Sequence, residues 1–479
     1  MVCRQSATLR LMNDSAIRNI IREKNPWWQD AGAWEADDLY LRELADAPYR
    51  YEPRILEDIE PPGLYVLTGP RRVGKSAEMR RTVRRLIDDG VEPRRIIYAS
   101  CDGFSQQDLR RFFIVGRALA RNIEGPLYWL VDEVTAIGDR WSEVVKDLRD
   151  DSPLRQDCVV LTGSSARGLE GATKNLAGRR GDVADSSRLL LPMTFRSFAT
   201  VTSVRGLPAA DPLRPKEMRT VAARALFDEL YYFIDGLNAA WADYLRVGGY
   251  PRAVTDLLNH GDVSKGFEQA LWEVVLGESR RTDGPGAPDT LGLLNRLAVG
   301  MASPVNLSRM AEDLGVGSHN TVEARIENLV TGYQAWRCYR SDRGKPKLSA
   351  QRKVYFTDPL LARLAALRSN AYNEPDETKL AEQQIGLALV AALGQASPGS
   401  VAQGSGVLYE RTKTGSEIDF VGPELKIAFE VKYGQGHWRR EARTVEANHE
   451  QSIMATADIY DTEHPAWAVP ASMLAWALG

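Results

Sequence analysis

The stretch Gly69-Pro70-Arg71-Arg72-Val73-Gly74-Lys75-Ser76 satisfies the pattern G-x-x-x-x-G-K-[ST] at every required position. An apolar, β-prone run over residues 64–68 precedes it, and residues 76–89 have helical spacing that ends at Gly90. The stretch therefore joins a strand to a helix. In that setting glycines let backbone N–H groups close around phosphates. The sequence predicts a phosphate-binding loop made of these eight residues.

Two side chains of the loop have predicted roles. Lys75 would place a positive charge at the β- and γ-phosphates of ATP, and the Ser76 hydroxyl would bind Mg²⁺. ATP and Mg²⁺ are therefore the expected ligands. The alternative, a Gly/Arg surface turn, does not explain why a strand precedes the loop and a helix follows it.

Composition limits the classes of protein that fit. A chain of 479 residues is too long for one ordinary core, so three or four compact units are expected. The formal net charge of −3 and the pI of about 6.1 exclude a globally basic nucleic-acid coat, so any DNA contact must be local. Four widely spaced cysteines fit a reducing compartment, and neither a signal sequence nor a membrane span is evident. A soluble cytoplasmic protein is expected.

Strand-like and helical stretches alternate between residues 61 and 200, which indicates an α/β fold with a parallel sheet covered on both faces. The apolar strand-like runs are residues 64–68, 95–101, 127–132, 159–162 and 188–191. Residues 95–101 separate the loop's strand from the third run in sequence. We expect those two strands to be neighbours in the sheet nevertheless.

The third run ends at Asp132-Glu133, where buried hydrophobic residues deliver two carboxylates to the carboxyl edge of the sheet. Asp132 is predicted to hold Mg²⁺, directly or through water, and Glu133 to polarise the attacking water. A helix N-cap is the alternative for an Asp-Glu pair after an apolar run. The phosphate-binding loop upstream favours the catalytic interpretation.

Several segments, spread over nearly the whole chain, have the order found in one known family. Together they resemble a family of bacterial and archaeal AAA+-type ATPases with a helical and winged-helix region and a restriction-endonuclease-like C-terminal domain. The segments are residues 25–28, 65–76, 98–102, 130–133, 161–165, 178–179, 191–198 and 247–253. The resemblance implies a polar sensor of the γ-phosphate at Ser164, or else at Thr162. A strand-end turn explains these two residues about as well.

The Gly-flanked pair Arg179-Arg180 offers two guanidinium groups that could reach a γ-phosphate, in cis or across a subunit boundary. An arginine in that position contributes roughly 10³ to 10⁵ in turnover. Both residues are therefore candidates for catalysis, and an oligomer is possible.

Residues 305–316 and 319–330 have helix-turn-helix spacing and precede an alternating hairpin. The hairpin resembles the wing of a winged helix. Glu323 and Glu327 make the second helix a poor reader of the major groove, so any DNA contact is assigned to phosphates at the hairpin. A packing role is equally compatible with the pattern. The basic residues of the hairpin are Arg337, Arg340, Arg343, Lys345, Lys347, Arg352 and Lys353.

The last part of the chain resembles the PD-(D/E)XK nuclease core. Asp419 lies on one predicted strand, and Glu430 and Lys432 lie on one face of the next, after a predicted helix that carries Glu382. Asp419 and Glu430 would hold Mg²⁺ and Lys432 would orient a hydroxide, with Glu382 as an accessory acid and Glu417 on the same face. Cross-strand ion pairs are the alternative.

These observations predict an N-terminal helical segment, a P-loop AAA+-type domain, a helical domain, a winged-helix domain and a PD-(D/E)XK nuclease-like domain. Their expected ranges are residues 1–60, 61–200, 201–285, 286–368 and 369–479. An ATPase coupled to DNA binding, and to possible Mg²⁺-dependent cleavage, is the preferred hypothesis. A nucleotide-gated regulatory switch with a degenerate nuclease-like scaffold is the alternative.

Overall fold

The computed structural model of the chain describes residues 12–138, 140–164, 175–183, 185–202, 204–279, 289–394, 406–434 and 438–479. Residue contacts divide the chain into two compact units. Unit 1 takes residues 1–47, 52–69 and 74–190, and unit 2 takes residues 48–51, 70–73 and 191–479. The two units are described separately.

Unit 1 is built on a five-stranded parallel sheet with the strand order β2-β3-β4-β1-β5. Because β4 pairs with both β1 and β3, the expectation that the loop's strand and the Asp-Glu strand are direct neighbours is wrong. The inserted strand comes later in the sequence, not between the two. The strands are β1 (Leu64–Thr68), β2 (Ile96–Ser100), β3 (Tyr128–Asp132), β4 (Cys158–Gly163) and β5 (Ser187–Leu189).

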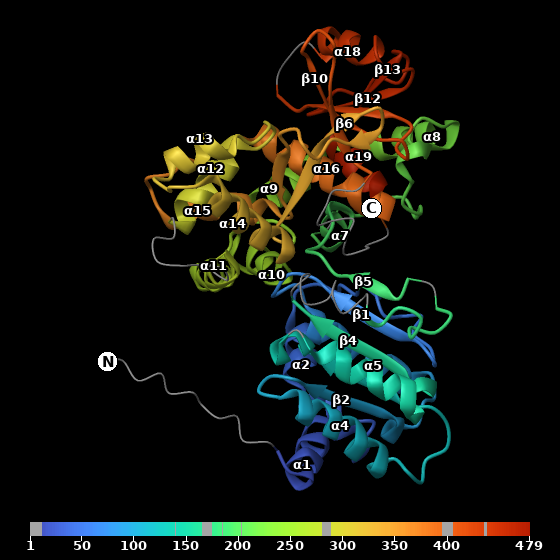
Figure 1. The fold of residues 1–479 in the computed structure, drawn as a ribbon. Coiled ribbons are helices and arrows are strands. Elements are labelled where there is room, and N and C mark those ends of the chain that lie inside the picture. The colour runs from blue at the N-terminus through green and yellow to red at the C-terminus, as the bar shows by residue number, and fades with distance from the viewer. Residues whose placement is uncertain are drawn as a thin grey trace. The chain divides into compact units, whose positions relative to one another are not determined.

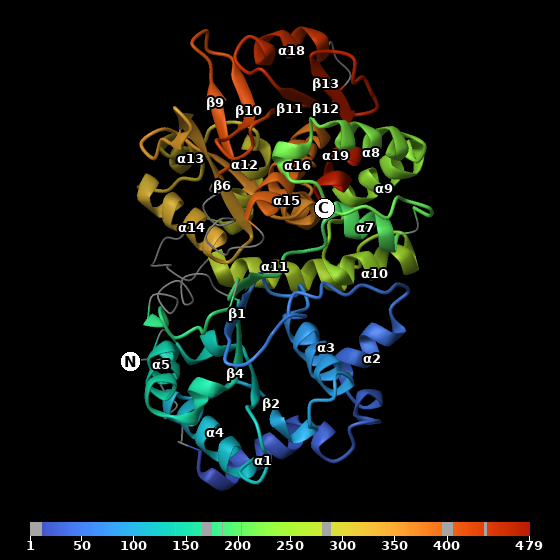
Figure 2. The same cartoon turned by 90° about the vertical axis from the view of Figure 1, so that its right-hand side faces the viewer.

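Helices cover both faces of this sheet, as the alternating pattern predicts. In Figure 2, α1, α4 and α5 lie on one side of the strands and α2 and α3 on the other. The first group packs on a continuous core that includes Val66, Ile97, Trp129 and Leu161. The helices are α1 (Asp14–Lys24), α2 (Leu39–Asp46), α3 (Lys75–Asp88), α4 (Gln106–Leu119) and α5 (Trp141–Asp151).

The N-terminal segment docks on β2 through polar contacts. Trp27 and Trp28 both donate their indole N–H to the carbonyl of Ile96, at 3.1 and 2.9 Å. Buried Asn25 accepts from the Tyr98 N–H at 2.6 Å and donates to the Tyr98 carbonyl at 2.9 Å. This side chain therefore makes the two hydrogen bonds to the edge strand β2 that the backbone of a neighbouring strand would make.

Unit 2 contains a mixed eight-stranded sheet with the order β13-β12-β11-β10-β9-β6-β7, in which β8 pairs with β6. The parallel pair β6–β9 makes the predicted winged-helix and nuclease-like ranges parts of one sheet. In Figure 1, α18 lies on one side of the β10–β13 part, and α16 and α19 lie on the other. The strands are β6 (Ala335–Asp342), β7 (Lys345–Pro346), β8 (Lys353–Phe356), β9 (Leu408–Arg411), β10 (Glu417–Val421), β11 (Ala428–Lys432), β12 (Ser452–Thr456) and β13 (Ala466–Pro470).

Helices make up the rest of unit 2, as predicted for residues 201–285 and for the helix-turn-helix spacing. The expected boundary between the helical and winged-helix domains, at residues 285 and 286, lies outside the described residues. The helices are α7 (Phe195–Val201), α8 (Val221–Tyr231), α9 (Ile234–Val247), α10 (Pro251–His260), α11 (Lys265–Ser279), α12 (Thr290–Gly300), α13 (Leu307–Asp313), α14 (His319–Thr331), α15 (Pro359–Arg368), α16 (Glu377–Gly394), α18 (Trp438–Glu446) and α19 (Ala471–Leu478).

The turn between α9 and α10 is a buried junction. Gly248 has φ +74°, and a Cβ there would lie 2.0 Å from Asp358 Oδ1. The Gly249 N–H donates to Asp358 Oδ2 at 2.7 Å, and its carbonyl accepts from the Met193 N–H at 2.8 Å. The Asp358 carboxylate also caps α15 through the Leu360 N–H at 2.8 Å. The backbone of this turn is therefore held by Asp358 and Met193.

Among the helices of the described ranges, none combines the length and the apolar character needed to cross a membrane.

Candidate functional site

The backbone of the phosphate-binding loop has the conformations that its glycines permit. Gly69 has φ +145°, and a Cβ there would lie 2.0 Å from the Leu190 carbonyl oxygen. Gly74 has φ +100° and directly precedes α3, so the first turn of that helix opens into the loop. Arg72 also has a positive φ, +70°. This path leaves the amino end of α3 at the loop.

Lys75 is buried and donates from Nζ to the Gly69 carbonyl at 2.9 Å. Its ammonium therefore lies over the first residue of the loop, inside the turn that phosphates would enter. The next side chain, Ser76, donates from Oγ to Asp132 Oδ2 at 2.7 Å. The loop and the Asp-Glu strand thus meet, although β4 separates their strands.

Asp132 is the centre of a hydrogen-bond network at the carboxyl edge of the sheet. Its Oδ1 accepts from the hydroxyl of Thr162 and its Oδ2 from the hydroxyl of Tyr98, the latter at 3.2 Å. Tyr98 comes from β2, Asp132 from β3 and Thr162 from β4. Burial, followed by the neighbouring Asp132 carboxylate, raises the pKa of Tyr98 above its usual range, so this phenol remains a donor.

Tyr98 is a candidate site residue that the sequence analysis did not single out. It stands in the middle of an apolar strand, where an aromatic side chain normally indicates core packing. Its position two residues before the end of a strand at the ligand-binding edge was the available signal.

Glu133 follows Asp132 in a left-handed conformation, with φ +52°. Its N–H donates to the Thr162 hydroxyl at 3.0 Å, and its Oε2 accepts from the Ser164 hydroxyl at 3.4 Å. Both polar residues proposed for the end of β4 therefore contact the Asp-Glu pair: Thr162 touches the aspartate and Ser164 the glutamate. A non-glycine residue in this backbone conformation is uncommon and marks a position whose surroundings constrain it.

The structure does not bring Arg179 and Arg180 to the loop within the chain. The Arg180 carbonyl accepts from the Leu64 N–H, at the amino end of β1, whereas the loop follows the carboxyl end of this strand. A strand of five residues spans roughly 15 Å. Arg179 pairs with Asp150 at 2.6 Å, and Arg180 donates to the hydroxyls of Ser186 and Ser187. The glycines that flank this arginine pair do not indicate which edge of the sheet the segment reaches, so the sequence could not place the pair.

Magnesium fits the residues present at the loop. The Ser76 hydroxyl and the Asp132 carboxylate provide two oxygen ligands 2.7 Å apart, and Mg²⁺ in nucleotide sites takes one or two protein oxygens together with phosphates and water. When bound, the ion would neutralise phosphate charge.

In unit 2 the residues predicted for the nuclease-like site lie together. The Asp419 N–H donates to Glu430 Oε2 at 3.1 Å, and Lys432 Nζ lies 2.8 Å from Glu430 Oε1. β10 pairs with β11 in antiparallel fashion, with Phe420 opposite Phe429. Glu382 joins this cluster from α16, but it does so through Lys353 of β8, at 3.0 Å. Throughout the described ranges, no three Asp, Glu, His or Cys side chains form a group able to hold a metal ion.

Burial shifts the titration of this cluster. It raises the pKa of Glu430 to about 8 and that of Glu382 to about 7, and the Asp419 carboxylate adds to both shifts. Burial alone would lower the pKa of Lys353, but the charged neighbours outweigh it and raise this pKa, so the ammonium stays protonated.

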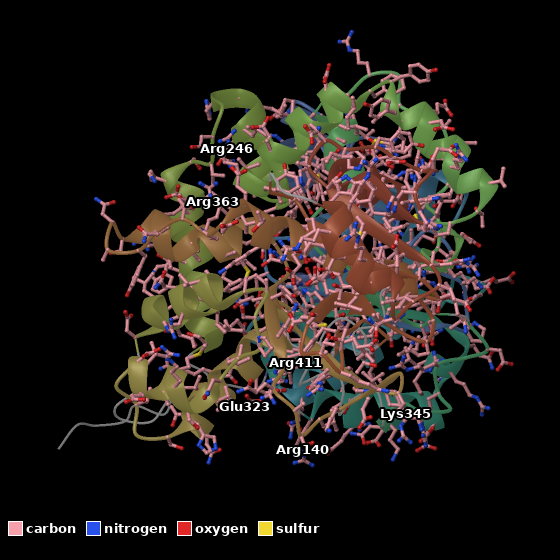
Figure 3. All side chains as sticks on the ribbon, turned by 90° about the horizontal axis from the view of Figure 1, so that it is seen from above. Arg140, Arg246, Glu323, Lys345, Arg363 and Arg411 are labelled. Atoms are coloured by element: carbon pink, nitrogen blue, oxygen red, sulfur yellow. The ribbon has the colours of Figure 1, made fainter. Side chains whose placement is uncertain are left out.

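The basic hairpin is less exposed than its sequence suggests. Arg337 is buried and pairs with Glu323 at 3.0 Å and with Glu327. Arg352 also pairs with Glu323, and Lys353 is fully buried. Three of the basic residues of the hairpin are therefore engaged by acids of the chain. These pairs also explain the acidic residues of α14. The exposed cations are Arg343, Lys345 and Lys347, of which Lys345 is labelled in Figure 3.

Two family models match parts of the chain. Residues 62–199 match the family described as "AAA domain". This segment is an AAA-type P-loop domain with a parallel α/β sheet. Residues 238–372 match a family described as "Domain of unknown function (DUF8612)". A Haemophilus influenzae protein described as uncharacterized is 23% identical over 318 residues, which cover 64% of this chain and 70% of the relative.

Solved structures show distant likenesses. A Walker-type ATPase of Pyrococcus abyssi has a TM-score of 0.36 and 15% identity, covering 72% of this chain and 96% of its own. A RuvB variant of Thermotoga maritima has a TM-score of 0.26 and 16% identity, covering 64% of this chain and 89% of its own. The ORC2 protein of Aeropyrum pernix has a TM-score of 0.26 and 13% identity, covering 70% of this chain and 94% of its own. The interpretation of unit 1 therefore depends on the AAA match and on the geometry of the loop, and not on these solved structures.

Proposed function

We propose that the AAA domain binds ATP with Mg²⁺ and hydrolyses it. The observation that carries this proposal is the 2.7 Å hydrogen bond from Ser76 to Asp132, because it joins the end of the phosphate-binding loop to the carboxylate that a nucleotide-bound Mg²⁺ requires. A surface turn of the same composition would have no reason to be bonded to a buried acid on another strand.

The side chains around this hydrogen bond have different proposed roles. Lys75 and the N–H groups at the start of α3 would bind the phosphates, while Ser76 and Asp132 would hold the cation. Glu133 would orient the attacking water and accept its proton. Thr162 and Tyr98 fix the orientation of Asp132 by donating to different oxygens of its carboxylate.

Glu133→Gln tests the catalytic part of the proposal. The amide keeps the shape of the side chain but cannot accept a proton, so turnover should fall by roughly 100-fold or more while ATP affinity changes little. Glu143→Gln, at a surface carboxylate of α5 paired with Arg140, is the matched control. Equal turnover in the wild type and in Glu133→Gln would contradict the assignment of Glu133.

A nucleotide-gated switch with slow turnover is the second candidate. It is favoured by the positions of Arg179 and Arg180, which are bonded at the amino end of β1, so that the transition-state charge lacks these cations within the chain. The two candidates differ in a single-turnover measurement. A switch retains bound ATP for many minutes, and the addition of other copies or of DNA would accelerate its loss if a cation arrives in trans.

For DNA we propose contact through phosphates at the exposed tip of the hairpin, Arg343 and Lys345, with affinity that depends on salt and little on sequence. Cleavage would require a divalent ion at Asp419 and Glu430. The contacts of these two carboxylates favour the scaffold alternative for the C-terminal sheet.

A further inference from the structure

Lys353 lies among the carboxylates of the nuclease-like sheet. Its Nζ is 2.7 Å from Glu417 Oε1, 3.0 Å from Glu382 Oε1 and 3.4 Å from Asp419 Oδ1. The side chain has no exposure to solvent, and the ring of Tyr409 lies 5.4 Å from the ammonium. Three acids from α16 and β10 therefore surround one cation that comes from β8.

The remaining oxygens of the predicted metal ligands also have donors. Asp419 Oδ2 accepts from the Val431 N–H at 2.9 Å. Glu430 accepts from Lys432 Nζ at 2.8 Å on Oε1 and from the Asp419 N–H at 3.1 Å on Oε2. The Tyr355 hydroxyl donates to Glu382 Oε1. The oxygens that a divalent ion would need are engaged by donors of the chain itself.

We infer that the ammonium of Lys353 takes the place of the divalent cation, so that the acids of the nuclease-like sheet form a metal-independent charge cluster. Magnesium does not fit these residues. A divalent ion bound to Asp419 would lie within a few ångströms of the buried ammonium, where like charges repel strongly because little water screens them. Removal of that ammonium by deprotonation is opposed by the surrounding carboxylates.

The cluster has a structural consequence that a metal site would not have. Lys353 is paired with Cys338 in the β6–β8 ladder, whereas its acidic partners belong to α16 and β10. The ion pairs therefore connect β8 to α16 and to β10 across the continuous sheet. A buried ion pair of this kind is costly to break, because the partner left behind is an uncompensated buried charge.

Divalent-ion binding tests the inference directly. Mn²⁺ is titrated into the nucleotide-free full chain, and the free ion is counted by electron paramagnetic resonance for the wild type, Asp419→Asn and, as the matched control on an exposed position of the same hairpin, Glu424→Gln. The three isotherms should coincide. A site with a Kd below about 1 mM that is present in the wild type and in Glu424→Gln but lost in Asp419→Asn would overturn the inference.

Thermal unfolding adds an independent test. Lys353→Met should lower the unfolding temperature by roughly 5 °C or more, whereas Lys347→Met, at an exposed position of the same hairpin, should leave it unchanged. Millimolar Mg²⁺ should stabilise Lys353→Met more than the wild type, because the acids then lack their cation. An unchanged unfolding temperature in Lys353→Met would contradict the inference. If that variant does not fold, the Mn²⁺ comparison between the wild type and Asp419→Asn decides.

Discussion

The hydroxyl of Ser76 lies 2.7 Å from Oδ2 of Asp132, although 56 positions separate the two residues in the sequence. Ser76 lies in the first turn of α3, and Asp132 ends β3, which is not the neighbour of the loop's own strand. This hydrogen bond makes the proposed cation site depend on the fold and not on either motif alone.

Ser76→Ala should therefore weaken nucleotide binding only when Mg²⁺ is present. Loss of one oxygen ligand should reduce the affinity for Mg-ATP by about tenfold or more, which corresponds to roughly 1.4 kcal/mol, and should leave binding in EDTA nearly unchanged. Equilibrium titration with a fluorescent ATP analogue measures both values. Ser100→Ala is the control, since within the described part of the chain the Ser100 hydroxyl bonds only to exposed Asp102. An equal loss with and without Mg²⁺ would speak against a cation ligand.

Asn25→Ala should destabilise unit 1. The side chain satisfies both the N–H and the carbonyl of Tyr98 on the edge strand β2, and its removal leaves both groups buried without this partner. The expected cost is about 2–4 kcal/mol, measured by urea unfolding. Asn13→Ala is a milder comparison, because Asn13 only caps the exposed start of α1. A cost for Asn25→Ala no larger than that of Asn13→Ala would contradict the docking role.

Asp358 should make the stability of unit 2 depend on pH. Burial raises its pKa to about 7, against about 3.9 for an unfolded aspartate. A group whose pKa is higher in the folded state contributes stability that is complete below the unfolded pKa and is lost as the pH rises through the folded pKa. Unfolding temperature should therefore fall between pH 4 and pH 8.

Asp358→Asn removes this titration and keeps one of the two oxygens, of which Oδ2 accepts from the Gly249 N–H and Oδ1 from the Leu360 N–H. The decline with pH should be shallower in this variant, although Glu382 and Glu430 contribute in the same direction. Differential scanning calorimetry of the wild type and the variant across this range measures the difference. A variant with the same slope as the wild type would show that Asp358 stays ionised.

Arg343→Glu combined with Lys345→Glu should weaken DNA binding and reduce the slope of log K against log salt by roughly 0.9 for each phosphate that the protein no longer neutralises. Arg205→Glu combined with Lys216→Glu makes the same change of net charge at exposed positions far from the hairpin in sequence. Fluorescence anisotropy with a duplex and a single strand at several salt concentrations measures the slopes. Equal slopes in both double variants would assign the hairpin to packing.

Local pattern was sufficient to locate the elements and the loop. The residues of β1, the loop and α3 are contiguous, so their spacing alone predicts a turn around phosphates, and Asp132 and Glu133 follow from the end of a buried strand. Strand order was not predictable in the same way, because nothing local distinguishes β4 from β3 as the neighbour of β1. Such pairings depend on how whole strands and helices pack.

The same limit explains why the burial of Lys353 among acids was not predicted from the sequence. Its alternation with charged neighbours on a short hairpin resembles a solvated face, and sequence gives no sign that the sheet continues past β6 into β9. Once that continuation is known, a lysine on β8 lies beside acids of α16 and β10. Arg246 and Arg363, labelled in Figure 3, illustrate another distant pairing: the Arg363 guanidinium donates to the Arg246 carbonyl.

The most direct test of the central claim is equilibrium binding of ATP, with Mg²⁺, to the wild type and to Lys75→Ala, with Lys146→Ala on α5 as the control. The account predicts saturable binding by the wild type and by Lys146→Ala, and a loss of at least about 100-fold in affinity for a Lys75→Ala protein that unfolds at the wild-type temperature. Binding of equal strength by all three proteins would contradict it.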